Sequence, residues 1–282
     1  MLRHRLAVLC LFVVALIAPP LPAAAAQATS AAPQPLSIGE TFTLDSKVMG
    51  ETRRINVYLP AGYHERADAK VPVLYMPDGG IAEDFLHIAG LMQVSMANGT
   101  MRPFMLVGIE NTQRRRDMTG PTDVASDRKI APVVGGAATF RAFIRDELMP
   151  EIDRRYRTTG ETAIIGESAA GLFILETLVL APEMFDAYIA IDPMLWWNNK
   201  AWMKGFRGFL GAHPDLQAKL FVAMSSEPMI AETVVWVPAV LQDAAPKGLV
   251  WRFQSLPDET HGTVFHPAAL RAFRALFAPE PR

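Results

Sequence analysis

Residues 162–180 read TAIIGESAAGLFILETLVL, and this stretch is the most informative part of the chain. Three apolar residues at 163–165 form a short strand candidate, followed by a run of small residues and then an apolar helix. In this arrangement Ser168 lies on a tight turn between strand and helix. Gly166 and Ala170 lie two residues before and after Ser168, where a larger side chain would collide with the folded backbone. The pattern therefore predicts a nucleophile elbow, with Ser168 as the nucleophile.

Strands and helices alternate along the rest of the chain. We expect strands at 41–44, 53–59, 71–76, 104–109, 163–165, 187–191, 220–224 and 250–254, and helices at 83–97, 139–156, 169–180, 200–211, 230–243 and 267–277. The first two strands read as an antiparallel pair. The later ones are apolar runs separated by helices, which predicts a mostly parallel central sheet with helices on both faces. Residues 111–136 show no period and read as one long functional loop.

The N-terminus reads as a targeting segment. Residues 1–26 combine a basic start, an apolar run at 6–18 and the small residues AAA at 24–26, which is typical of a secretory signal peptide. An uncleaved anchor is the alternative, although the apolar run is short for a membrane span. Residues 27–40 then form a flexible tether and 41–282 a single α/β domain. We therefore expect an exported protein, periplasmic or secreted, without stable membrane insertion once the signal is removed.

Charge and cysteine content narrow the function classes. Removing residues 1–26 takes two of the 27 basic residues and none of the 29 acidic ones, so the net charge changes from −2 to −4. This mild acidity argues against a nucleic-acid partner, which needs a basic face. The one cysteine, Cys10, lies in the signal segment. The mature chain therefore has no disulfide, thiol nucleophile or cysteine-bound metal.

A serine nucleophile needs a base and usually an acid that orients the base. Functional groups of parallel sheets gather beyond the carboxyl ends of strands, and His261 and His266 follow the last strand. His261 precedes a glycine and is the preferred base, whereas His266 precedes a proline that starts the last helix. Glu227 is the preferred acid because it follows the strand at 220–224 and gives the chain order serine, acid, histidine. Asp192, after the preceding strand, is the alternative acid.

Ester chemistry also needs N–H donors directed at the developing oxyanion. The residue after the nucleophile, Ala169, supplies one. The turn after the strand at 71–76 supplies the other from Gly80 or Ile81. The simpler interpretation of that turn is a plain connection from strand to helix. No metal or organic cofactor is required.

Several stretches resemble one known family. They are MPDGG at 76–80, LVGIENTQRRRDMTGPT at 106–122, IIGESAAGLF at 164–173, AYIAIDPMLWWNN at 187–199 and ETHGTVF at 259–265. In order and spacing, the chain resembles the putative esterase family of α/β-hydrolases, which contains esterase D-like enzymes and periplasmic siderophore esterases acting on enterobactin-type trilactones. The resemblance implies an α/β-hydrolase fold, Ser168 as nucleophile and His261 as base. The chain departs from the family at Ala170, where glycine is usual, at Asp192, where serine is usual, and at Gly120, which lengthens a loop.

Four further residues are candidates for substrate binding. Arg114 or Arg116 could clamp an anionic or catecholate group through planar guanidinium donors, although Arg116 could instead pair with Asp117 and hold the loop. Trp196 and Trp197 could form an aromatic wall beside the site or pack in the core.

The sequence thus predicts an exported serine esterase with a small-molecule ester substrate. An acyltransferase would use the same acyl-enzyme with an alcohol acceptor. A non-catalytic periplasmic binding protein on a hydrolase fold is the third possibility. The identity of the ester does not follow from the residues.

Overall fold

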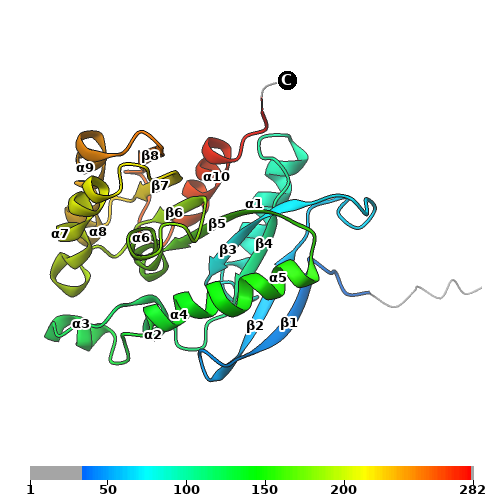
Figure 1. The fold of residues 1–282 in the computed structure, drawn as a ribbon, viewed down its shortest axis with the longest axis horizontal. Coiled ribbons are helices and arrows are strands. Elements are labelled where there is room, and N and C mark those ends of the chain that lie inside the picture. Colours follow the sequence, from blue (N-terminus) through cyan, green and yellow to red (C-terminus); the bar gives the residue numbers. More distant parts are fainter. Residues whose placement is uncertain (1–33, 281–282) are drawn as a thin grey trace, which may run out of the picture. The chain divides into compact units, whose positions relative to one another are not determined.

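Eight strands form one sheet in residues 34–280, the part of the chain that the computed structural model describes (Figure 1). The strand order is β1-β2-β4-β3-β5-β6-β7-β8. The strands are β1 (Glu40–Ser46), β2 (Glu51–Tyr58), β3 (Val71–Pro77), β4 (Met105–Ile109), β5 (Thr158–Glu167), β6 (Ala187–Ile191), β7 (Ala218–Met224) and β8 (Leu249–Ser255). β1, β2 and β4 pair antiparallel, and from β4 to β8 all neighbours are parallel. The expected antiparallel start and mostly parallel sheet are confirmed.

The connections between parallel strands are helical. The helices are α1 (Phe85–Ala97), α2 (Arg114–Met118), α3 (Ala125–Ile130), α4 (Ala137–Phe143), the π-helix η1 (Ile144–Leu148), α5 (Met149–Arg155), α6 (Ala169–Leu180), α7 (Trp197–Ala212), α8 (Pro228–Val234), α9 (Val237–Ala244) and α10 (Phe265–Leu276). Parallel neighbours need such crossovers because the chain must return to the starting edge of the sheet before the next strand begins, and a two-residue turn is too short for that.

The strands are buried on both faces because their residues alternate between two hydrophobic clusters. In β3, Val73 and Tyr75 join one cluster, and Leu74 and Met76 join the other. The first cluster contains the apolar faces of α4, α6, α7 and α9, and the second contains those of α1 and α10. This explains why β3 and its neighbours read as solid apolar runs rather than as alternating ones.

Three expected elements differ from the structure. Residues 111–136 are not one irregular loop, because α2 and α3 lie within them. Asp117 of α2 is buried and paired with the fully buried Arg53 of β2 at 2.6 Å, which fixes this segment to the sheet. The helix expected at 230–243 is divided into α8 and α9, and Pro238 stands near the start of α9. The helix expected at 139–156 contains the π-helical turn η1.

Contacts between residues divide the chain into two units, Met1–Leu36 and Ser37–Arg282. The sheet and its helices lie in the second unit. The predicted signal peptide, residues 1–26, lies outside the described residues, as do residues 27–33 of the tether predicted at 27–40. Glu40, the last residue of that tether, begins β1. Among residues 34–280, no helix is both long and apolar enough to cross a bilayer.

Candidate active site

Three residues with positive φ lie directly after three neighbouring parallel strands. Asp78 follows β3 with φ 59°, Ser168 follows β5 with φ 60°, and Asp192 follows β6 with φ 44°. Because β3, β5 and β6 are adjacent and parallel, the three residues lie at the same carboxyl edge of the sheet. A non-glycine residue in such a conformation costs about 1–3 kcal/mol, and this strain is found most often at functional sites. The carboxyl edge is therefore the candidate active site.

Ser168 occupies the predicted turn between β5 and α6. Its N–H donates to the Ile191 carbonyl at 3.0 Å, and its own carbonyl accepts from Leu172 at 3.0 Å. The turn leaves no room for larger side chains at Gly166 and Ala170. A Cβ added to Gly166 would lie 2.5 Å from the Ala170 Cβ, which explains the small residues on either side of the serine. The backbone therefore has the tight geometry of a nucleophile elbow.

His261 contacts Asp192. The histidine Nδ1 lies 3.0 Å from Asp192 Oδ2, and the carboxylate is fully buried while the histidine side chain is 37% exposed. This hydrogen bond raises the pKa of His261, against the lowering effect of burial, and Glu167 adds to the increase by charge attraction. A carboxylate on Nδ1 leaves Nε2 as the ring nitrogen that faces other groups. The pair has the geometry of a base held by an acid.

The expected acid, Glu227, does not orient His261. Within residues 34–280, its carboxylate makes neither a hydrogen bond nor an ion pair with that histidine. Glu227 instead stands at the N-cap of α8, where its carbonyl accepts from Ala231 at 2.8 Å. It acts on His261 only at longer range, by charge attraction. The carboxylate that contacts His261 Nδ1 is therefore that of the alternative acid, Asp192, and not that of the preferred Glu227.

Ser225 is a part of the site that the sequence did not indicate. It follows β7, and both its N–H and its hydroxyl donate to the Asp192 carboxylate at 2.5 Å. The end of β7 was expected to supply the acid. It instead supplies Ser225, which donates both hydrogen bonds to the Asp192 carboxylate. The only sequence signal was a small polar residue directly after a buried strand.

Glu167, directly before the candidate nucleophile, is another group that sequence reasoning did not single out. The pKa of Glu167 is raised to about 7, and burial is the largest cause. The charge of His261 opposes this rise, and the charge of Asp192 adds to it. Its Oε1 is buried and has no hydrogen-bond partner in the described structure. A carboxyl group that titrates near neutral pH therefore lies within electrostatic range of the histidine.

The Ser168 hydroxyl and His261 lie at the same sheet edge but are not hydrogen-bonded to each other within residues 34–280. Nucleophile–base contacts are often long without substrate and shorten in the reacting complex. A direct contact between the Ser168 hydroxyl and His261 during the reaction is therefore a proposal.

The candidate oxyanion donors differ in availability. Ala169 is the first residue of α6, and the first N–H groups of a helix have no partner within it. The Gly80 N–H donates to Glu83 Oε2 at 2.6 Å, so it is already engaged. Ile81 lies next to it in the same turn, and this residue is 54% exposed. Ala169 and Ile81 remain the better candidates.

The two candidate arginines have carboxylate partners. Arg114 makes a two-pronged contact with Asp78, Nε to Oδ1 at 2.6 Å and Nη2 to Oδ2 at 2.7 Å. Arg116 pairs with Asp117 at 2.6 Å and with Glu51 at 2.8 Å, which is the loop-holding arrangement. Arg114 lies at the carboxyl edge of the sheet, because its partner Asp78 is one of the three positive-φ residues at that edge.

The two tryptophans differ in burial. Trp197 is buried in the first hydrophobic cluster, and its ring N–H approaches the Gly120 carbonyl at 3.4 Å. Trp196 is partly buried against the same cluster, with the two ring centroids 5.9 Å apart. The structure thus uses Trp197 as a core residue.

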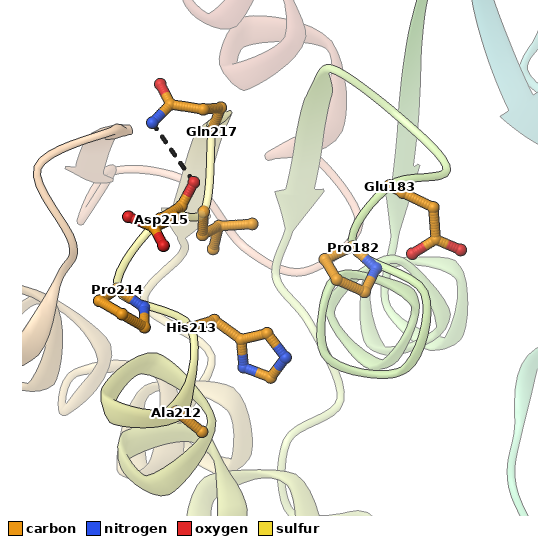
Figure 2. A pocket seen from close by; sticks show the side chains of 8 residues that line it. Pro182, Glu183, Ala212, His213, Pro214, Asp215 and Gln217 are labelled. Atoms are coloured by element: carbon orange, nitrogen blue, oxygen red, sulfur yellow. Dashed lines mark hydrogen bonds between the residues drawn. The ribbon is translucent and has the colours of Figure 1, made fainter.

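A surface pocket of about 460 Å³ lies elsewhere (Figure 2). It is lined by Pro182, Glu183 and residues 212–217, which connect α6 to β6 and α7 to β7. These connections lead into the amino ends of the strands. The pocket therefore lies at the edge opposite Ser168.

Comparison with known proteins finds a family that this chain matches. The family described as Putative esterase matches residues 46–223, more than half of the chain. The ferri-bacillibactin esterase BesA of Bacillus subtilis is 33% identical over 154 residues, 50% of each protein. A siderophore triacetylfusarinine C esterase of Aspergillus fumigatus is 32% identical over 187 residues, 59% of each. The chain thus spans between half and three fifths of these two relatives.

A solved structure covers more of the chain. The crystal structure of an IroE-like serine hydrolase from Shewanella oneidensis has a TM-score of 0.78 and 30% identity, and covers 85% of this chain and 80% of that one. Together with the strand order, this likeness confirms the predicted α/β-hydrolase fold.

Proposed function

The chain belongs to the putative esterase family, and from this premise we propose that it is an exported serine esterase that hydrolyses carboxylic esters. The observation that carries the proposal is the contact of His261 Nδ1 with the buried Asp192 carboxylate, at the sheet edge that holds Ser168 on a strained turn. A histidine fixed in this way exposes a basic Nε2 and stabilises the imidazolium that forms when it takes a proton.

In the proposed reaction, the Ser168 Oγ attacks the ester carbonyl carbon while His261 Nε2 takes the hydroxyl proton. The tetrahedral intermediate collapses, its C–O bond to the alcohol breaks, and His261 returns the proton to the departing alcohol oxygen. Water then attacks the acyl-enzyme with His261 again as base, which releases the acid and restores the serine. Asp192 stays ionised throughout and keeps the imidazole in place.

The oxyanion of both intermediates would be stabilised by backbone N–H groups. The Ala169 N–H lies at the start of α6, where the helix dipole also favours negative charge. The Ile81 N–H is the proposed second donor, and Gly80 could serve only if Glu83 released it. One such donor is worth about 10²–10³ in kcat.

Siderophore-type esters are the proposed substrate class, supported by the names of the two curated relatives. Arg114 and Trp196 are the proposed contacts for a substrate at this edge, because both stay partly accessible. Arg114 is already paired with the Asp78 carboxylate, which balances its positive charge. It would therefore contribute a remaining N–H donor to the substrate rather than an unpaired positive charge.

Export is supported by the composition of residues 1–26. Expression of the full chain in a bacterial host, followed by intact-mass measurement of the periplasmic fraction, tests it. We expect a product that begins at Gln27, and retention of residues 1–26 would contradict export through a cleaved signal.

The catalytic proposal is tested with simple acyl, feruloyl and siderophore esters, using wild type and Ser168→Ala. We expect wild type to hydrolyse at least one class, and the variant to lose about three orders of magnitude or more. Equal turnover by both proteins would remove Ser168 from the mechanism. Product analysis with added alcohol separates hydrolysis from acyl transfer.

A further inference from the structure

A second group of titratable side chains lies outside the proposed catalytic set. Asp84, His87 and His266 place one ligand atom each within 4.8 Å of one another. The Asp84 Oδ1 lies 3.1 Å from His87 Nδ1 and 3.1 Å from His266 Nε2. The two imidazole rings meet edge to face, with centroids 4.8 Å apart. Two imidazoles and one carboxylate therefore converge on one point.

The backbone that carries these side chains is held firmly. Asp84 is the N-cap of α1, His87 lies in the first turn of α1, and His266 is the second residue of α10. α1 and α10 pack against each other on one face of the sheet. The neighbours Phe85 and Phe265 are buried in that interface, so the three ligand residues have fixed starting points.

The Asp84 carboxylate is directed at the histidines rather than at the helix. An aspartate at an N-cap usually accepts from the N–H groups of the first turn, but this one makes no such bond. A capping bond is worth about 1 kcal/mol, so the side chain forgoes it for the histidine contacts. The three side chains also remain partly exposed to solvent, which leaves a path for an ion.

We propose that Asp84, His87 and His266 form a binding site for a divalent transition-metal ion of the Zn²⁺ class. Neighbouring ligand atoms in a tetrahedral zinc site with bonds of about 2.0–2.1 Å lie about 3.3 Å apart. The two contacts of 3.1 Å already have this spacing. The two histidine nitrogens would have to approach each other, which the exposed His87 side chain permits.

The donor set selects the kind of ion. Imidazole nitrogen suits zinc, copper, nickel and iron, whereas magnesium and calcium prefer oxygen ligands alone. Three protein ligands leave a coordination position open to water or to another molecule. The site is separate from the ester chemistry, since the proposed reaction of Ser168 requires no metal.

Its position connects the site to the carboxyl edge. The Asp84 N–H donates to the Asp78 carbonyl at 3.1 Å, across the turn that contains Gly80 and Ile81. His266 lies five residues after His261, at the end of the same loop. An ion at Asp84 would therefore join this turn to the start of α10.

The test is Zn²⁺ binding by calorimetry to the purified mature chain. We expect one ion per chain, bound at least about tenfold more weakly by Asp84→Asn, His87→Gln and His266→Gln, because loss of an outer partner of a metal ligand already costs 10–100-fold. His213→Gln is the matched control, since this histidine lies at the opposite edge, and it should bind like wild type. A Zn²⁺-dependent rise in Tm that is lost in the three variants would support the same site.

Two further variants separate this site from the catalytic pair. His261→Gln and Ser168→Ala should bind Zn²⁺ as wild type does, whether or not the esterase proposal holds. Binding that is lost with His261→Gln and kept in His266→Gln would overturn the proposal, because the ion would then occupy the His261–Asp192 pair. Absence of saturable binding by wild type would overturn it as well.

Discussion

The carboxyl edge and the amino edge of the sheet hold their polar groups in opposite ways. At the carboxyl edge, the buried Asp192 accepts two bonds from Ser225 and faces His261, and three non-glycine residues have positive φ. At the amino edge, a pocket of about 460 Å³ is lined by residues including His213, whose ring contacts the carbonyl and the ring of Phe209 in α7 (Figure 2). The pocket thus lies where the backbone shows no comparable strain.

This difference indicates which features mark chemistry. A pocket can form wherever two loops diverge, whereas a buried charge and strained turns cost free energy and persist only when the surrounding structure holds them. The comparison therefore assigns reactivity to the carboxyl edge. The following variants test it, in order of expected effect.

The largest effect is expected from the acid. Asp192→Asn should lower kcat by about 10⁴-fold, because an amide no longer stabilises the imidazolium and favours the wrong histidine tautomer. Glu227→Gln is the matched control, and it should lower kcat by less than about tenfold. Steady-state kinetics on one ester measures both, with circular dichroism to confirm folding. A larger loss in Glu227→Gln would return the acid role to Glu227.

Much of the fold could be predicted because burial leaves a clear pattern. Strands buried on both faces read as solid apolar runs, and the helices between them show their period. The small residues around Ser168 likewise follow from the space that the turn allows. The elements within 111–136 were missed because α2 and α3 are too short to show a period, and the Arg53–Asp117 pair that holds them joins residues 64 positions apart.

The site was harder to predict for a geometric reason. Asp192 and Glu227 both follow parallel strands at the same edge, and chain order favoured Glu227. Only the observed contacts show that His261 reaches the end of β6, while the end of β7 supplies Ser225 to hold the acid. A distance between loop side chains leaves no trace in periodicity. The cluster of Asp84 and His266 was missed for the same reason, as its members lie 182 positions apart.

The strain at Ser168 can be measured as stability. Ser168→Gly should unfold with a free energy about 1 kcal/mol higher than Ser168→Ala, because glycine accepts φ 60° without steric cost while alanine keeps the strain. The greater flexibility of unfolded glycine offsets part of this gain. Urea denaturation of the two inactive variants measures the difference. If Ser168→Ala proved the more stable, the turn would not be strained.

The pH profile tests the charges around the histidine. His261 must be neutral to act as a base, and its pKa is raised by the Asp192 hydrogen bond and by Glu167. Activity should therefore fall on the acid side at a higher pH than for an ordinary histidine. Glu167→Gln removes one negative charge, lowers the His261 pKa, and should move this acid limb to lower pH. Because Glu167 itself has a pKa of about 7, the wild-type limb belongs to the coupled pair.

Profiles of kcat/KM against pH for the two proteins measure this shift. Glu167→Asp keeps the charge and serves as the control, with a limb closer to that of wild type. A limb that stayed in place in Glu167→Gln would mean that the two groups titrate independently.

The smallest effect is expected at the amino edge. His213→Ala removes a ring that packs on Phe209 at a centroid distance of 4.3 Å and a 2.8 Å contact to its carbonyl. These contacts hold the end of α7, so the variant should lose about 0.5–1.5 kcal/mol of stability. Its kcat/KM should stay within about twofold of wild type, because the substitution changes no residue at the carboxyl ends of the strands. A loss of activity comparable to that of Asp192→Asn would place chemistry in the pocket at the amino edge and reverse the assignment of the two edges.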